Sequence, residues 1–146
     1  NFYPSYVSDA QYKWGAARAG AEAEQKALHP DRPDIAKANM DAWAQGHPKP
    51  VATVQEVADH IDHIVKRIGI DHVGVGGDFD GGSIGLQGMP DVSAYPALLL
   101  ELAKRGYSKQ DLEKVSSLNT LRVLKAAEAY AAAHKGDAPI ESPTSF

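Results

Sequence analysis

The sequence contains no cysteine among its 146 residues. Disulfide bonds and zinc sites built on thiolates are therefore excluded within this chain. It also contains no apolar run of about 18 residues, the length that a membrane-spanning helix requires. Lys and Arg number 15 against 19 Asp and Glu, which gives a formal net charge of −4 at pH 7. Because no basic stripe or Arg cluster accompanies this mild acidity, we exclude nucleic acid as a partner.

An initiating Met and a signal peptide are also absent, since the chain begins Asn1-Phe2-Tyr3-Pro4. A sequence that opens on an aromatic cluster looks as if it starts within a folded structure, so we expect a part of a longer polypeptide. Apolar residues make up 43% and charged residues 23% of the chain. This composition supports a packed core and argues against global disorder.

The first fifty residues predict a strand end followed by a helical excursion. Residues 1–8 are aromatic and β-favouring, with Pro4 interrupting them, so we expect the end of a strand running into a loop. Two helices follow, over 9–28 and 34–45, and a proline-containing segment ends each of them. We interpret residues 9–50 as a helical insertion that projects from a compact body.

A capping signal and an apolar stripe mark the clearest helix. Thr53 is a favoured N-cap residue and Glu56 stands three positions later, which is the capping-box pattern. Apolar residues then recur at helical spacing and predict one buried face before Gly69 ends the helix; they are Val54, Val57, Ala58, Ile61, Ile64, Val65 and Ile68.

The segment after this helix has the character of a strand. Residues 72–77 combine Val with Gly, and small residues there allow another group to approach closely. Further predicted elements are a helix over 94–105 capped by Ser93, a short helix capped by Ser108, a helix over about 118–134 and a loose tail over 136–146.

The sequence predicts a single convincing strand among several helices, and this combination indicates the fold class. One apolar, glycine-rich strand between two amphipathic helices is typical of a parallel α/β sheet. Such a strand needs neighbouring strands for its backbone hydrogen bonds, and this chain offers no convincing neighbour. We therefore expect the C-terminal segment of a larger α/β enzyme, mostly helical within this chain.

The residue with the strongest chemical signal follows that strand. Asp78 comes after Gly76 and Gly77, where parallel α/β barrels place their reactive groups. A carboxylate at such a position suits proton transfer to and from a metal-bound water. The alternative is an Asp that caps or forms a turn after two glycines, and the residues alone leave both interpretations open.

Other polar residues give weaker signals. Asp80 fails the calcium-loop template because no Glu closes the loop. His60 and His63 share a helical face opposite the apolar stripe, which we interpret as a solvated face and not a metal site. Tyr6 would share a rim with Asp78 if the two strands are neighbours, where its phenol could donate a hydrogen bond to substrate. Packing of Tyr6 beneath the insertion is the alternative.

Several stretches resemble the membrane (renal) dipeptidase family of metallopeptidases. They are Asn1–Tyr6 (NFYPSY), Val57–Ile64 (VADHIDHI) and Gly74–Gly81 (GVGGDFDG), with further similarity at 91–96, 100–108 and 119–124. The order and spacing of these unrelated motifs agree from residue 51 to about 128, which is most of the chain.

The resemblance implies a (β/α)8 barrel of the amidohydrolase type, in which a hydroxide bridging two zinc ions hydrolyses a dipeptide. Residues 1–8 would end the penultimate strand, 72–77 would be the last strand, and 51–135 would form the last β/α unit with the C-terminal helices. Asp78 matches the acid at the end of the eighth strand, which acts in proton transfer, and Tyr6 matches a tyrosine of the substrate pocket.

The resemblance also sets expectations about what lies outside the chain. The zinc ligands of the family precede residue 1, so we assign no metal ligand here and expect the N-terminal part of the same enzyme as a partner. A homodimer is a further expectation. The 9–50 insertion is longer than the connector of mammalian-type enzymes, looks like a bacterial elaboration, and would cover the pocket mouth or a subunit contact. Alone, the chain is expected to be neither stable nor active.

Three other functions stay open at this point. A related barrel amidohydrolase would act on another amide or on a lactone. A dipeptidase-like domain without catalysis would serve binding or assembly. A self-standing helical interaction domain would need no missing segment.

Overall fold

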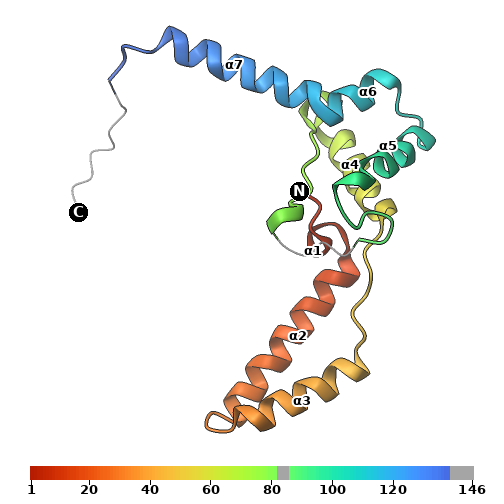
Figure 1. The fold of residues 1–146 in the computed structure, drawn as a ribbon, viewed down its shortest axis with the longest axis vertical. Coiled ribbons are helices and arrows are strands. Elements are labelled where there is room, and N and C mark those ends of the chain that lie inside the picture. Colours follow the sequence, from red (N-terminus) through yellow and green to blue (C-terminus); the bar gives the residue numbers. More distant parts are fainter. Residues whose placement is uncertain (82–85, 139–146) are drawn as a thin grey trace.

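The computed structural model describes residues 1–81 and 86–138. These residues form α1 (Pro4–Val7), α2 (Asp9–Leu28), α3 (Pro33–Gly46), α4 (Val54–Ile68), α5 (Tyr95–Lys104), α6 (Lys109–Glu113) and α7 (Asn119–Ala133). Short 3-10 turns lie at Ile70–His72, Phe79–Gly81 and Val92–Ala94, and a π-helical turn, Lys114–Leu118, joins α6 to α7. In Figure 1 the α2–α3 hairpin and α7 project in different directions from a central body around α4 and α5.

Helix α4 begins where the capping pattern predicts. The backbone N–H of Thr53 donates to Glu56 Oε2 over 2.8 Å, and the N–H of Glu56 donates to Thr53 Oγ1 over 3.2 Å. These reciprocal bonds satisfy donors that the first helical turn cannot pair internally. Gly69 follows the last residue of the helix, so both predicted ends of α4 are confirmed.

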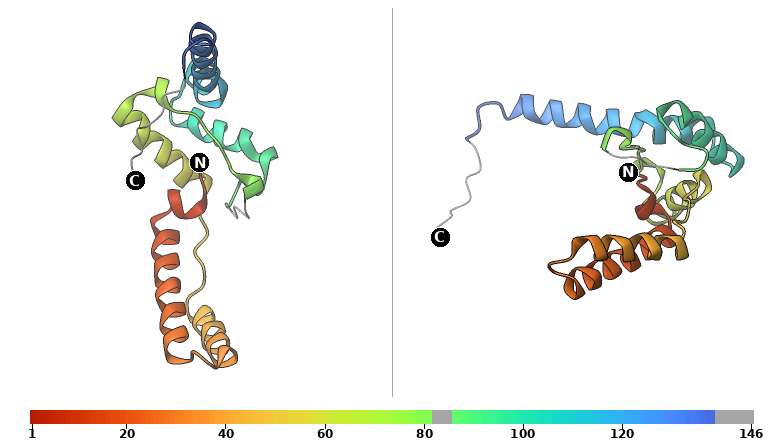
Figure 2. Two further views of the ribbon diagram at one scale, coloured as in Figure 1. Left: turned by 90° about the vertical axis from the view of Figure 1, so that its left-hand side faces the viewer. Right: turned by 60° about the horizontal axis from the view of Figure 1, so that its bottom comes forward.

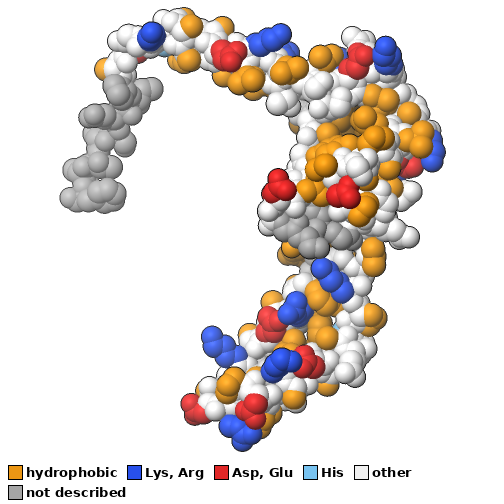
Figure 3. Space-filling view, in the orientation of Figure 1, with side chains coloured by type: hydrophobic (Ala, Val, Ile, Leu, Met, Phe, Trp, Pro, Cys, Tyr) orange, Lys and Arg blue, Asp and Glu red, His pale blue; other side chains and the backbone are white. Residues whose placement is uncertain are grey.

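The core joins segments that lie far apart in the sequence. Val57 and Leu98, from α4 and α5, are among its fully buried side chains. Each such side chain contributes about 1.5–3 kcal/mol to folding relative to an exposed one. Figure 3 shows apolar side chains gathered over this central body. The complete core consists of Phe2, Ala52, Val54, Val57, Ala58, Ile61, Val73, Leu86, Met89, Leu98, Leu102 and Val115.

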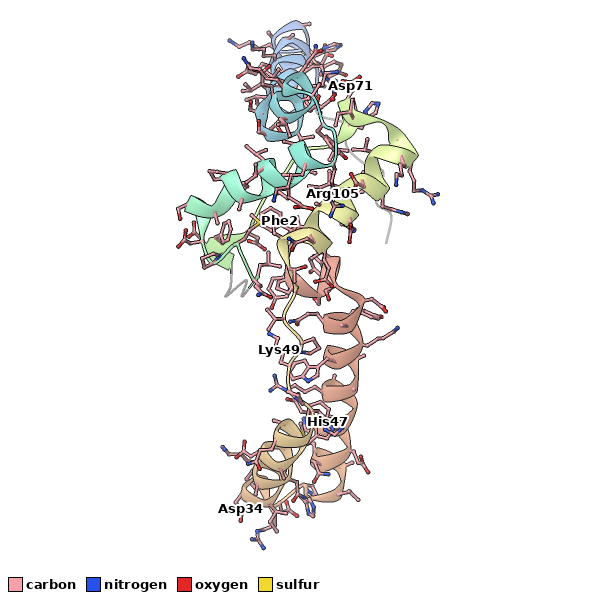
Figure 4. The ribbon with its side chains drawn as sticks, turned by 90° about the vertical axis from the view of Figure 1, so that its right-hand side faces the viewer. Phe2, Asp34, His47, Lys49, Asp71 and Arg105 are labelled. Carbon is pink, nitrogen blue, oxygen red and sulfur yellow. The ribbon has the colours of Figure 1, made fainter. Side chains whose placement is uncertain are left out.

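The two helices predicted within 9–50 are confirmed as α2 and α3, which form the projecting hairpin. Trp14 of α2 donates its indole N–H to the carbonyl of His47 over 2.8 Å and packs 5.9 Å from the ring of Trp43. At the base of the hairpin, the side chain of Gln11 donates to the carbonyl of Pro50. Figure 4 shows His47 beside α2, and Figure 2 shows the hairpin standing away from the body.

Helix α7 leaves the body with its apolar side chains uncovered by the described residues. Leu121, Val123, Leu124 and Tyr130 are 45%, 57%, 52% and 67% exposed. Beside the helix lies a mainly apolar groove of about 570 Å³, which reaches Val73. The helix predicted over 118–134 is therefore present, but this chain does not bury its predicted apolar face.

The strand predicted over 72–77 is not formed within the described residues. His72 ends a 3-10 turn, and Val73 begins an extended segment with φ −114° and ψ 133°. The carbonyl of Val73 accepts from Asn119 Nδ2 over 2.8 Å, and the N–H of Val75 donates to the carbonyl of Val115 over 3.2 Å. No neighbouring strand is available in residues 1–81 or 86–138, so this segment bonds to groups around α7 instead of a ladder.

The expected strand end within residues 1–8 also differs. Tyr3 is extended, but Pro4–Val7 forms one turn of helix. Proline is favoured at the first helical position because its missing N–H has no intrahelical partner there. The preference of Pro4 for the first position of a helix therefore outweighs the β-favouring composition of residues 1–8.

Ser93 does not cap α5 as predicted. Asp91 instead accepts from the N–H of Ser93 over 2.8 Å and caps the 3-10 turn that precedes the helix. Ser108 does cap α6, and Asp111 completes a second capping box. Of the predicted loose tail, residues 139–146 lie outside the described residues.

The leucines of α5 provide a matched test of the core. Replacing Leu98 by Ala leaves a cavity beneath α4 and costs about 2–5 kcal/mol of local stability. Replacing Leu100 by Ala, on the same helix and 57% exposed, costs less than about 0.5 kcal/mol. Hydrogen exchange of the α4 and α5 amides measures both effects, and equal exchange in the two variants would contradict this core.

Candidate active site at Asp78

Asp78 ends the extended segment in an unusual backbone conformation. Its φ is +57°, and among the described residues it alone has a positive φ without being glycine. Asp tolerates this left-handed region better than most residues because its short side chain can bond locally, although the conformation still costs energy. The side chain is exposed. The turn therefore presents the carboxylate to solvent at the end of residues 73–77.

Two glycines make room for groups around Asp78. A side chain at Gly81 would collide with the Asp78 carboxylate, and the N–H of Gly81 donates to the Asp78 carbonyl over 3.1 Å. A side chain at Gly77 would meet the ring of Phe79 at 2.5 Å and the hydroxyl of Tyr95 at 2.9 Å. Gly77 thus accommodates aromatic packing, whereas Gly81 accommodates the carboxylate.

Three aromatic rings support the turn. Phe2, Phe79 and Tyr95 pack edge to face in all three pairings, with ring centroids 5.8–5.9 Å apart. This is a favourable arrangement of aromatic quadrupoles. Phe2 is only 3% exposed, and Figure 4 shows it inside the body near α4 and α5. The cluster links the N-terminal segment, the Asp78 turn and α5.

Asn1 contacts the carboxylate directly. Its side-chain Nδ2 donates to Asp78 Oδ2 over 3.1 Å, although the two residues are 77 positions apart. Its Oδ1 accepts from the N–H of Tyr3 over 2.8 Å. Sequence reasoning did not assign Asn1 a role, and the available signal was its place beside the aromatic cluster at the start of the chain.

Tyr6 belongs to the same N-terminal segment but does not bond to Asp78 within the described residues. Its ring packs 5.6 Å from that of Tyr3 and is 66% exposed, while its N–H donates to the carbonyl of Tyr3 over 2.8 Å. Tyr6 is therefore not packed beneath the hairpin as a buried aromatic. Its phenol is accessible from solvent.

The described residues do not form a metal site. No group of three or more His, Asp or Glu side chains in residues 1–81 and 86–138 has an arrangement that could hold an ion. His60 is half-buried and lines a small cavity of about 80 Å³ together with Asn1 and Phe2, whereas His63 is exposed. By themselves, the residues that the structure describes therefore do not fit the ligand requirements of a zinc pair.

A second polar cluster, which sequence reasoning missed, joins α4 to α5. Arg105 donates to Asp59 Oδ1 over 2.6 Å, to Asp62 Oδ2 over 2.7 Å and to Glu101 Oε1 over 3.0 Å. The hydroxyl of Tyr107 donates to Asp62 Oδ1 over 2.7 Å. Asp59 and Asp62 lie on the α4 face that was predicted to be merely solvated, and only the approach of α5 and the residues after it brings them to Arg105 and Tyr107.

The environment of this cluster favours its charged pairs. Partial burial by itself would raise the pKa of Asp62, but hydrogen bonds from Arg105 and Tyr107 lower it below its ordinary value. Burial opposes the charge of Arg105, yet its carboxylate partners raise the pKa of the guanidinium. Burial and the bond to Asp62 raise the pKa of the Tyr107 phenol. The cluster fastens α4 to α5 and makes no contact with Asp78.

The chain belongs to the membrane dipeptidase family (Peptidase family M19), because the sequence profile of that family matches residues 1–137. Members of this family are metallopeptidases, and the family implies a (β/α)8 barrel for the full-length protein. The mostly helical character predicted for this chain is confirmed, and so is the resemblance from which the family was inferred.

Curated relatives are similar over most of the chain but are much longer. Dipeptidase tcpJ of Claviceps purpurea is 42% identical over 98 residues, which are 67% of this chain and 23% of that protein. Dipeptidase ataJ of Aspergillus terreus is 50% identical over 76 residues, 52% of this chain and 18% of that protein. Dipeptidase 3 of Rattus norvegicus is 44% identical over 91 residues, with coverages of 62% and 19%. The matches thus span about a fifth of each relative.

The two aspartates that bind Arg105 differ in exposure and provide a matched pair. The side chain of Asp62 is 23% exposed and that of Asp59 is 69% exposed. We expect Asp62→Asn to lower the free energy of unfolding by about 1–2 kcal/mol near neutral pH. Asp59→Asn should lower it by less than about 0.5 kcal/mol, because solvent screens the ion pair between Arg105 and the exposed Asp59.

The effect of Asp62→Asn depends on pH. Folding lowers the pKa of Asp62. The ionised side chain therefore stabilises the fold fully when the pH is above its pKa in the unfolded chain, ~3.9, and this stabilisation disappears as the pH falls through its pKa in the folded chain. Denaturant titrations across that range measure the difference between wild type and variant. A difference that grows on acidification would contradict the ionised cluster.

Proposed function

We propose that this chain is the C-terminal segment of a dipeptidase and supplies one acid–base residue, Asp78, to its active site. The observation that carries the proposal is the accessible carboxylate of Asp78, presented by a supported turn at the end of an extended segment. The reaction is hydrolysis of the peptide bond of a dipeptide. Membership of the dipeptidase family supports the substrate class.

The extended segment and α7 support the proposal that further barrel segments complete the fold. Residues 73–77 have no strand neighbour within the described residues, and buried backbone groups require partners. The uncovered apolar side chains of α7 and the groove beside it offer surface for such segments. The N-terminal part of the same enzyme is the partner that fits both features.

Asp78 would act by moving one proton. Its carboxylate accepts a proton from the water that adds to the peptide carbonyl carbon. It then returns that proton to the amine nitrogen as the carbon–nitrogen bond breaks, so the carboxylate ends in its starting state. One carboxylate oxygen, Oδ2, is held by Asn1, while Oδ1 lies over Gly81. These contacts hold the carboxylate at the turn, where the residue stays exposed to solvent.

The metal ions of this family would be held elsewhere. The two zinc ions that the resemblance implies have no ligand set among the described residues. We propose that their ligands lie in the segments that complete the barrel. When bound, such ions supply electrostatic activation of water and of the scissile carbonyl.

Asp78→Asn tests the proposed role in the complete enzyme. Removing the proton acceptor should lower kcat by about 10²–10⁴-fold, while the metal content and melting temperature stay at wild-type values. Asp80→Asn is the control, since this exposed carboxylate lies in the same turn and has no proposed part in proton transfer. Wild-type turnover of Asp78→Asn on a dipeptide would remove Asp78 from the reaction.

Tyr6→Phe tests the substrate contact. Losing one hydrogen bond of about 1 kcal/mol should raise KM about fivefold and leave kcat nearly unchanged. Tyr3→Phe removes the phenol of the tyrosine that packs against Tyr6 and should leave KM unchanged. Steady-state kinetics on the same dipeptide compares them, and equal KM values in the two variants would argue against a specific role for Tyr6.

A further inference from the structure

We propose that Asn1 is a positioning residue for Asp78, whose carboxylate it orients through a hydrogen bond. The inference rests on the proposed function of Asp78 and names a second member of the same site. Its starting point is the 3.1 Å bond from Asn1 Nδ2 to Asp78 Oδ2, which joins residues 77 positions apart.

The orientation of the Asn1 amide follows from its other bond. Asn1 Oδ1 accepts from the backbone N–H of Tyr3 over 2.8 Å, a partner that can only donate. The opposite end of the amide, Nδ2, is a donor and therefore faces Asp78. A turned amide would place two acceptors together at Asp78 and two donors together at Tyr3. The backbone thus selects the orientation in which Asn1 donates to the carboxylate.

The residues that follow Asn1 and Asp78 keep their hydrogen bond in place. Phe2 follows Asn1 and Phe79 follows Asp78, and their rings pack edge to face at 5.9 Å. Tyr95 packs against both rings at 5.8 Å, and Phe2 is almost fully buried. Each end of the hydrogen bond therefore lies one residue away from the same aromatic cluster. The cluster limits how far Asn1 can move from Asp78.

The bond has one chemical consequence for Asp78. The donor on Oδ2 restricts rotation of the carboxylate, and the absence of a side chain at Gly81 leaves room for Oδ1 close to the turn. Asn1 thus limits the directions in which the acid–base group can face.

The test measures kcat and KM for Asn1→Ala and Asn1→Asp in the complete enzyme. Asn1→Ala removes the donor that orients the carboxylate and should lower kcat about tenfold, with KM changed less than about twofold. Asn1→Asp keeps the shape but places an acceptor in place of the donor at Oδ2, so its kcat should fall at least as far. Asn39→Ala is the matched control, because Asn39 is exposed on α3 and bonds only to Gln25 among the described residues.

The outcomes separate this inference from the proposed function. If Asp78→Asn stops turnover but both Asn1 variants keep the wild-type kcat, the positioning role is wrong and the function of Asp78 stands. A fall in kcat that comes with a lowered melting temperature would also overturn it, because that pattern describes a structural residue. If Asp78→Asn leaves turnover intact, the proposed function fails first. Should Asn1→Ala not fold, the isosteric Asn1→Asp supplies the same measurement.

Discussion

The contact of Phe2 with Phe79 and Tyr95 is the interaction on which the rest of the site depends. It brings the N-terminal segment onto the turn that contains Asp78 and ties both to α5. Aromatic side chains suit this purpose because they bury a large area and have few rotatable bonds. The exposed bond between Asn1 and Asp78 would be weak by itself, and the packing of the buried Phe2 ring against the partly buried Phe79 ring keeps its two partners together.

The opposite end of the extended segment depends on α7. Asn119 donates to the carbonyls of Ile70 and Val73 over 2.7 and 2.8 Å, so the helix satisfies backbone groups that a sheet would otherwise pair. The same helix leaves its apolar side chains exposed beyond this anchor. An extended segment without a strand neighbour among the described residues, beside a helix that they leave uncovered, agrees with matches that span about a fifth of each relative.

The polar cluster around Arg105 and the contact at Asp78 have different physical characters. The Arg105 cluster is partly buried, pairs opposite charges, and fastens α4 to α5. The Asp78 carboxylate is exposed and accepts from a single neutral donor among the described side chains. A cluster whose charges are all paired contributes to stability, whereas strained backbone such as the turn at Asp78 is often found at functional sites. This contrast supports assigning the proposed chemistry to Asp78.

The sequence by itself determined the longer helices, because capping residues and apolar spacing act within a few positions: Thr53 with Glu56 and the stripe to Ile68 are local signals. It also determined the family, since family membership is carried by motifs. Only the tertiary structure decided that Asn1 meets Asp78, that Gly77 makes room for aromatic rings, and that Arg105 joins three carboxylates. Such contacts join residues many positions apart, and no local propensity encodes the approach of one segment to another.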